Sequence, residues 1–214
     1  CQRKLLWYDL IPILSFLLLR GKCRSCHFPI SVQYPIVELL AGALFVAVLF
    51  LPQQNSQLSI TLVYYLFIVS SLIVIFFTDL KYGIIPDKIV YPAIAVACIY
   101  LLLTTYYSQL TTHLRSGVGA FLFFFGIFAL THGRGMGFGD VKLSFLLGLI
   151  FSFPKIVYVL YTAFLTGALF SIILLILGKK RLKETIVFGP FLVIASLFIL
   201  FFGQYLNALW FLPT

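Results

Sequence analysis

Two aspartates in unusual surroundings are the residues of this chain most suited to chemistry. Asp79 follows a long apolar run. Asp140 ends the glycine-rich segment 135–140, and a second apolar run follows it. An ionised carboxylate beside such a run is energetically costly. The glycines leave the backbone before Asp140 without side-chain bulk, so another chain could approach it closely. Brought together by the fold, the two carboxyls could share a proton and activate a water against a peptide bond.

A simpler interpretation is that each aspartate caps a helix at a membrane surface, where Asp is a good N-cap and remains in contact with water. Residue type alone favours this interpretation. Asp87 competes with Asp79 for a catalytic role, but it lies between Pro86 and Lys88, where a turn or helix cap explains it better.

Composition predicts an all-helical protein that crosses a membrane several times. Of 214 residues 62% are hydrophobic and only 10% are charged, whereas a soluble domain carries about a quarter charged residues. Nearly uncharged runs as long as a bilayer is thick recur along the chain, and lipid cannot satisfy the exposed backbone of other structures. We therefore expect a polytopic bundle of about seven membrane-embedded helices. The expected helices cover residues 35–51, 60–77, 89–103, 117–130, 141–153, 156–177 and 186–202 or beyond.

The net charge of +9 does not indicate nucleic-acid binding, because the basic residues form short patches between apolar runs. When the loops are assigned to alternate sides, all Lys and Arg residues except Arg115 and Lys155 fall on one side. By the positive-inside rule that side is cytoplasmic. It also carries both Asp79 and Asp140, so the two acids are predicted to meet at the cytoplasmic face.

The polar N-terminal segment predicts a second, small domain. We expect a cytoplasmic segment over residues 1–34 and a transmembrane domain over 35–214. The segment contains an apolar stretch, residues 10–19, too short to span a membrane and therefore interfacial or the core of a small subdomain. Because the first residue is Cys rather than Met, we expect that the natural N-terminus is truncated.

Three of the four cysteines lie in this polar segment. Cys23 and Cys26 have the CxxC spacing of zinc ligands, which is also compatible with redox chemistry or with free cytosolic thiols. Cys98 lies in an apolar run and is most simply a small buried hydrophobe. Glu38, one turn into the first long helix, is explained equally well by the helix dipole or by a role in a site.

Taken in order, these motifs resemble the type IV prepilin peptidases, within the GxGD group of membrane aspartyl proteases. The resemblance covers residues 1 to about 145. It rests on Trp7-Tyr8-Asp9-Leu10-Ile11-Pro12, Gly21-Lys22-Cys23-Arg24-Ser25-Cys26, Tyr34-Pro35-Ile36-Val37-Glu38-Leu39-Leu40, Thr78-Asp79-Leu80, Ile85-Pro86-Asp87 and Gly135-Met136-Gly137-Phe138-Gly139-Asp140-Val141-Lys142-Leu143. The ordered set is much more specific than GxGD alone, and it favours catalysis over helix capping.

The resemblance implies a bifunctional enzyme of the bacterial inner membrane. Such an enzyme cuts the basic leader from prepilin or pseudopilin precursors at the cytoplasmic face, then N-methylates the new amino terminus with S-adenosylmethionine. Carried over, Asp79 and Asp140 form the catalytic pair, with Gly137, Gly139 and Lys142 as the supporting motif.

The resemblance also implies a role for the polar segment. Cys23 and Cys26 match the second of two zinc-binding CxxC pairs, and Cys1 matches the last member of the first. The remaining ligand would precede this sequence. Glu38 falls in a recurring block that the resemblance places near the methyl-transfer region.

Two other functions fit parts of the sequence. The chain could be a GxGD protease that does not methylate its product, or a transporter whose intramembrane acids carry protons. The absence of a convincing internal repeat, and the placement of both acids at one face, disfavour the transporter. The sequence does not distinguish among pilin-like precursors or indicate an oligomeric state.

Overall fold

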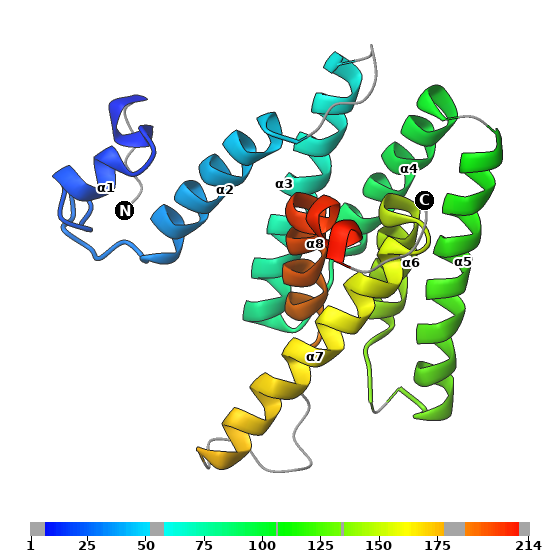
Figure 1. The fold of residues 1–214 in the computed structure, drawn as a ribbon. Coiled ribbons are helices and arrows are strands. Elements are labelled where there is room, and N and C mark those ends of the chain that lie inside the picture. Colours follow the sequence, from blue (N-terminus) through cyan, green and yellow to red (C-terminus); the bar gives the residue numbers. More distant parts are fainter. Residues whose placement is uncertain (1–6, 52–57, 106, 134, 178–186, 210–214) are drawn as a thin grey trace. The chain divides into compact units, whose positions relative to one another are not determined.

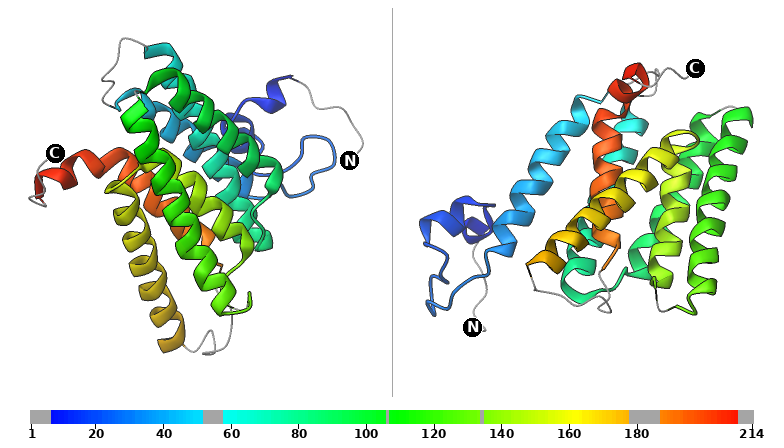
Figure 2. Two further views of the ribbon diagram at one scale, coloured as in Figure 1. Left: turned by 90° about the vertical axis from the view of Figure 1, so that its right-hand side faces the viewer. Right: turned by 60° about the horizontal axis from the view of Figure 1, so that its bottom comes forward.

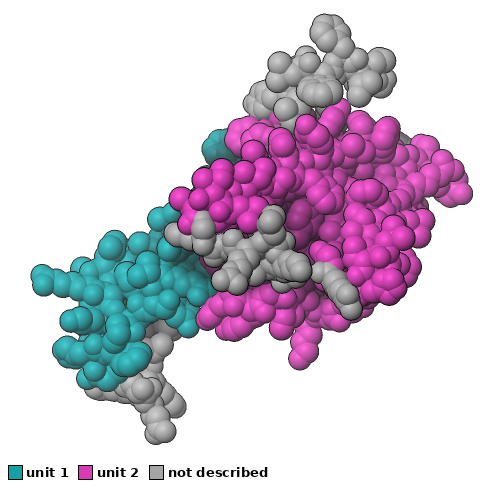
Figure 3. Space-filling view, turned by 90° about the horizontal axis from the view of Figure 1, so that it is seen from below, with its two compact units in different colours: residues 1–51 teal, residues 52–214 magenta. Residues whose placement is uncertain are grey.

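The chain forms two compact units, residues 1–51 and 52–214, coloured separately in Figure 3. The computed structural model describes residues 7–51, 58–105, 107–133, 135–177 and 187–209. All elements in these ranges are helices, and the one β-bridge among them, between Lys22 and Pro29, is isolated. The predicted all-α class is therefore confirmed. The predicted domain boundary after residue 34 stays a prediction.

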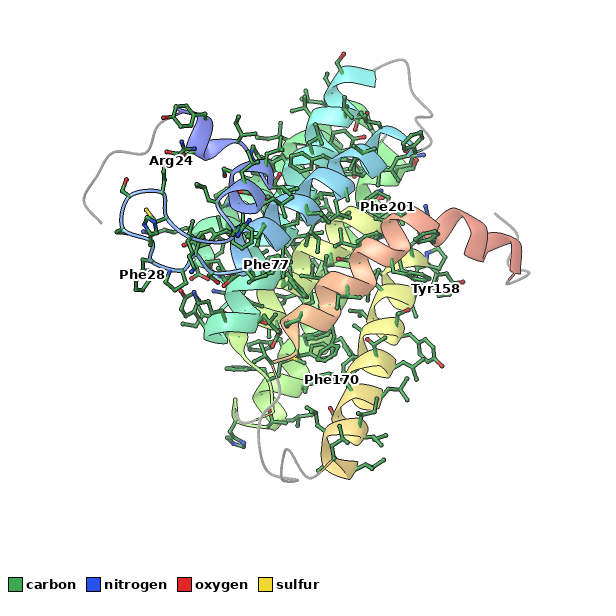
Figure 4. All side chains as sticks on the ribbon, turned by 90° about the vertical axis from the view of Figure 1, so that its left-hand side faces the viewer. Arg24, Phe28, Phe77, Tyr158, Phe170 and Phe201 are labelled. Atoms are coloured by element: carbon green, nitrogen blue, oxygen red, sulfur yellow. The ribbon has the colours of Figure 1, made fainter. Side chains whose placement is uncertain are left out.

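The first unit contains a 3-10 helix, η1 (Trp7–Leu10), the short helix α1 (Leu14–Leu18) and the longer α2 (Gln33–Leu49). Arg24 pairs with Asp9 at 3.0 Å and lies over the Tyr8 ring (Figure 4). No residue of α1 is buried, so the expectation that this apolar stretch forms the core of a small subdomain is wrong. Its exposed leucines agree with the interfacial alternative.

The described residues of the second unit form a bundle of six helices, whose arrangement Figures 1 and 2 show. They are α3 (Leu58–Tyr82), α4 (Asp87–Thr104), α5 (Tyr107–Leu130), α6 (Phe138–Phe151), α7 (Lys155–Ile176) and α8 (Gly189–Leu209).

The expected start of the fourth helix at residue 117 is wrong, because α5 begins at Tyr107. Its first turns lie against the C-terminal end of α6, where the His113 ring Nδ1 lies 2.6 Å from the carbonyl oxygen of Leu149. Tertiary packing thus keeps a polar sequence helical, which composition alone did not indicate.

Within the described ranges four helices are long and apolar enough to cross a membrane, namely α3 from Ser59 onward, α4, α5 and α7. Helix α2 and the stretch Gly189–Gly203 of α8 are apolar but shorter. Helix α6 has 14 residues, which span about 21 Å and fall short of a bilayer's hydrocarbon core. The expected number of about seven membrane-embedded helices is therefore not confirmed.

The short helix α6 is the centre of the second unit. It contacts α4, α5, α7 and α8, and its buried residues lie all around its circumference, as expected for a core helix. Its longest contact is with α5, beside which it runs in both Figure 1 and Figure 2. The position of Asp140, in the first turn of α6, is thus set by a helix that is packed on every side.

Close approach of α5 and α6 depends on glycine. A Cβ atom on Gly148 of α6 would lie 2.6 Å from the Gly117 Cα and from the Ser116 carbonyl oxygen of α5. These are backbone atoms that cannot move without shifting the helix. The small residues therefore set the spacing between the two helices, as small residues do at helix contacts in membranes.

We expect Gly148→Ala to destabilise the protein by about 1–3 kcal/mol, because the added methyl group overpacks this contact. Gly126→Ala is the matched control, since its Cβ would meet nothing within 4 Å on the same helix pair. That control should be neutral or stabilising, because alanine is the better helix former. Thermal unfolding in detergent measures both. Equal melting temperatures for the two variants would contradict the close contact.

Candidate active site

Both aspartates lie at one end of the helix bundle. Helix α3 ends there, and α4, α6 and α8 begin there, on the lower side of Figure 1. Gly83 has a φ of +64° and its N–H donates to the Asp79 carbonyl oxygen at 2.8 Å, which terminates α3 and turns the chain toward α4. The structure therefore brings together the two segments that the sequence singled out.

Asp140 is held by the backbone of its own helix start. Gly137 is the N-cap of α6, and its backbone N–H donates to the Asp140 carboxyl. This is the side-chain half of a capping box, with the acid three positions into the helix. The side chain is only 6% exposed, and its Oδ1 has no hydrogen-bond partner among the described residues. Asp140 is thus not the N-cap residue itself.

Asp79 lies in the last turn of α3, so it does not cap a helix N-terminus. It is 3% exposed, and its Oδ2 finds no hydrogen-bond partner in the described part of the chain. The backbone amide of Gly189, at the start of α8, contacts its carboxyl. A carboxyl at this end of a helix is disfavoured by the helix dipole, so stability of α3 does not explain its presence.

Ile85 connects the surroundings of the two acids. A Cβ atom on Gly139, the residue before Asp140, would lie 2.9 Å from the Ile85 Cβ, and one on Gly189 would lie 3.2 Å from the Ile85 Cδ1. Ile85 is itself buried. Its side chain therefore packs against one glycine next to each aspartate, and both glycines lack the room for a larger residue.

The two carboxyls are close enough to interact electrostatically. Burial is the main cause that raises the pKa of Asp140 to about 7, and the negative charge of Asp79 raises it further. The Gly137 N–H acts in the opposite direction but is the smaller effect. At neutral pH Asp140 can therefore hold a proton beside a second carboxyl, as a coupled pair requires.

Lys142, two residues beyond Asp140, joins α6 to the start of α4. Its Nζ forms an ion pair with Asp87, and it lies 5.4 Å from the ring centroids of both Tyr91 and Phe138. Asp87 therefore has a structural partner, which agrees with the turn or cap interpretation over a catalytic one. The ion pair lies at the surface between the starts of α4 and α6, with Asp87 more than half exposed.

The cysteine motif lies in the first unit. Cys23 is half-buried and Cys26 exposed, and both are free thiols. The backbone N–H groups of Cys26 and Ser25 lower the pKa of the Cys23 thiol. Cys1 lies outside the described residues, and no group of three metal-binding side chains occurs among those that the structure describes.

Glu38 has a local structural partner. Its Oε2 accepts a hydrogen bond from the Ile13 backbone N–H at 2.8 Å. Ile13 has a φ of +62°, which is strained for a β-branched residue. The carboxylate therefore holds an unusual turn before α1, a contact that neither interpretation of the sequence anticipated.

The sequence analysis missed Gly189 and Ile85. One signal for Gly189 was present in the sequence. Residues 189 and 190 are a Gly-Pro pair at the start of an apolar run, and Pro favours the first turn of a helix, so a helix start could be expected there. Nothing in the sequence indicated that this helix start lies against Asp79.

Comparisons with known proteins identify the family of this chain. The family model described as "Bacterial Peptidase A24 N-terminal domain" matches residues 1–51, and the model "Type IV leader peptidase family" matches residues 66–172. The second match contains both aspartates. The chain belongs to the type IV leader peptidase family.

Three relatives that match at least 95% of this chain are named "Prepilin leader peptidase/N-methyltransferase". The Bacillus subtilis protein is 32% identical over 95% of this chain and 80% of its own length. The Aeromonas hydrophila protein is 32% identical over 100% of this chain and 73% of its own length. The Burkholderia pseudomallei protein is 31% identical, and the chain spans 65% of its length. No solved structure matches this one.

The family assignment agrees with the expected membrane location, since the chain is an integral membrane protein with several apolar helices. The basic residues that predict its orientation lie largely in 1–6, 134 and 178–186, outside the described residues. The side of the membrane on which the aspartates lie therefore stays a prediction.

The raised pKa of Asp140 predicts a pH-dependent stability. The folded-state pKa of about 7 exceeds the ordinary value of 3.8, so the folded protein binds a proton that the unfolded chain releases between these pH values. Stability should fall as pH rises through 7. Asp140→Asn removes the titrating group and therefore this loss of stability. The melting temperature of the variant minus that of the parent should rise by a few degrees from pH 5 to pH 8.

The same pH series in an Asp79→Asn background separates the two causes of the raised Asp140 pKa, which are burial and the charge of Asp79. There the charge of Asp79 is gone, so the gain from Asp140→Asn should be smaller but still present because of burial. A melting-temperature difference that does not vary with pH in either background would contradict the raised pKa.

Proposed function

We propose that Asp79 and Asp140 are the catalytic pair of a membrane aspartyl endopeptidase that removes the leader from prepilin-like precursors. The observation that carries this proposal is the pairing of two buried carboxyls that interact electrostatically, each with one oxygen free of hydrogen bonds among the described residues. Family membership and the names of the relatives support the substrate class.

A pair with one shared proton can hydrolyse a peptide bond. The ionised carboxyl takes a proton from a water, whose oxygen bonds to the scissile carbonyl carbon, while the protonated carboxyl donates to the carbonyl oxygen. The carbon–nitrogen bond then breaks as the proton gained from water passes to the leaving amine, and one hydroxyl of the tetrahedral carbon returns its proton to the donor carboxyl. Asp140 is the proton donor in this scheme, because its raised pKa keeps the proton near neutral pH.

In this proposal the same chain also methylates the amino terminus that cleavage exposes, and the relatives' names, which join a prepilin leader peptidase to an N-methyltransferase, support this second activity. S-adenosylmethionine is the methyl donor in this proposal. Glu38 lies in the segment 34–40 that resembles the family's recurring block. Its hydrogen bond to Ile13, however, supports a structural role rather than binding of the methyl donor.

The proposed site lies at the cytoplasmic face of the bacterial inner membrane. A precursor with a basic leader and an apolar stem would present its junction at that face, because positive charge is retained there. The position of both aspartates at the end of the bundle, rather than midway along its helices, supports access from the water phase.

Zinc is proposed for the first unit, with Cys23, Cys26 and Cys1 as ligands. The described pair fits a zinc site in two respects. Their spacing is that of a zinc-binding turn, and the backbone N–H groups around Cys23 favour the thiolate, which is the form that binds metal. Zinc would stabilise the turn that connects α1 to α2.

Asp79→Asn and Asp140→Asn should each lower the rate of precursor cleavage by at least about 10²-fold, because each removes one of the two proton-transfer groups. Cleavage of a prepilin by the purified protein in detergent, followed by gel mobility, measures this. Asp87→Asn is the matched control, since Asp87 pairs with Lys142 at the surface, and it should retain most of the activity. Normal cleavage by either of the first two variants would refute the proposed pair.

A methyl-labelled donor in the same reactions tests the second activity. With intact precursor, label should enter the product of the parent protein but not of the two inactive variants, while an already trimmed precursor should be labelled by all three. Cleavage without labelling in any reaction would favour a GxGD protease that lacks methyl transfer.

The zinc proposal predicts that Cys23→Ser lowers the zinc content of the purified protein by more than half, since one ligand is lost. Cys98→Ser is the control, because Cys98 lies in α4 within the second unit, and it should leave the metal content unchanged. Elemental analysis measures both variants. Equal zinc content in parent and Cys23→Ser would count against these ligands.

A further inference from the structure

The start of α8 lies directly against Asp79. A Cβ atom on Gly189 would overlap the Asp79 Oδ2 and lie 3.0 Å from its Cγ. The backbone amide of the same glycine contacts the carboxyl. Because only a hydrogen atom fits at this position, the Asp79 carboxyl rests on the backbone of Gly189.

Aromatic packing fixes the position of this glycine. The preceding residue, Phe188, has its ring centroid 5.0 Å from that of Phe164 on α7 and 6.0 Å from that of Phe124 on α5. Phe124 is fully buried. The residue immediately before α8 is therefore anchored between two other helices.

The residues that follow Gly189 strengthen this anchor. The ring of Phe191 lies 5.5 Å from that of Phe170 on α7, which Figure 4 labels. The Phe188 carbonyl oxygen accepts the Phe191 N–H at 3.0 Å and the Leu192 N–H at 3.3 Å, which forms the first turn of α8. The Gly189 N–H has no acceptor within its helix at this position, so it is available to a side chain outside the helix.

We propose that Gly189 is a positioning residue for peptide hydrolysis, which holds the Asp79 carboxyl in the orientation that the reaction needs. This inference rests on the proposed role of Asp79 and extends it to a residue on a different helix. Because Gly189 has no side chain, the Asp79 carboxyl has room beside it, and the Gly189 N–H in the first turn of α8 fixes the rotation of the carboxyl group. Reaction rates depend steeply on such placement, since a displacement of about 1 Å can cost 10²-fold.

The kinetic test compares Gly189→Ala with Gly126→Ala, whose Cβ would meet nothing within 4 Å. Gly189→Ala should lower kcat for precursor cleavage by about 10–100-fold, because the added methyl group displaces the carboxyl. KM should change by less than about twofold, since the substrate-binding surface away from Asp79 is intact. Gly126→Ala should cleave like the parent. Unchanged kcat in Gly189→Ala would overturn the inference.

A stability test does not depend on catalysis. If the methyl group of Gly189→Ala clashes with the Asp79 carboxyl, it should lower the melting temperature of the parent but have little effect in an Asp79→Ala background, where the carboxyl is absent. Such a double-mutant cycle isolates the contact. Failure of Gly189→Ala to fold alone, with recovery in the Asp79→Ala background, supports the contact. Equal destabilisation in both backgrounds, or failure to fold in both, overturns it.

The results separate this inference from the proposed function. If Asp79→Asn still cleaves the precursor, the catalytic role of Asp79 is wrong, whatever Gly189→Ala does. If Asp79→Asn is inactive and Gly189→Ala is fully active, the catalytic pair stands and only the positioning role is lost.

Discussion

The main energetic constraint on the second unit is that it buries two carboxyls close enough to repel each other. Removing a charged group from water costs several kcal/mol unless it is paired or neutralised, and Asp79 and Asp140 are both almost completely buried. Neither pairs with a described cation. A single proton between them relieves both the desolvation and the repulsion, which is why the pKa of Asp140 is raised toward neutrality. The energetic cost of this arrangement is the same feature that makes it suited to proton transfer.

Sequence reasoning predicted the helical class, and the placement of Asp79 and Asp140 at one end of the bundle, better than the number of spans. The apolar runs indicated helices correctly, because lipid leaves few alternatives for the backbone, and alternation of loops placed both aspartates at one end of the bundle. Helix α6 was harder to interpret, since a 14-residue apolar helix can be a short span or a buried core helix. The start of α5 was missed because its polar residues have a partner, Leu149, that is distant in sequence.

The features of the structure that could not be predicted from the sequence are contacts between segments that are distant along the chain. Glu38 illustrates this, since its type and position suggested a helix-dipole or site role, whereas its partner is the strained Ile13 backbone. Gly189 is a second case. A glycine at a helix start has many explanations, and only the position of α8 against α3 shows that its missing side chain is what accommodates Asp79. Residue types indicate which groups can react, but packing decides which groups meet.

Helix ends explain why the acids occupy these positions. Asp140 lies in the first turn of α6, where the positive end of the helix dipole favours a carboxylate, whereas Asp79 lies at the negative end of α3, which disfavours one. The start of α8 at Gly189 brings a second positive helix end to Asp79 and offsets the effect of α3. The two carboxyls thus sit in different fields although they share one site. At Asp140 burial outweighs the helix dipole and raises the pKa to about 7, so this carboxyl can hold the proton. A defined donor and a defined acceptor are what general acid–base hydrolysis requires.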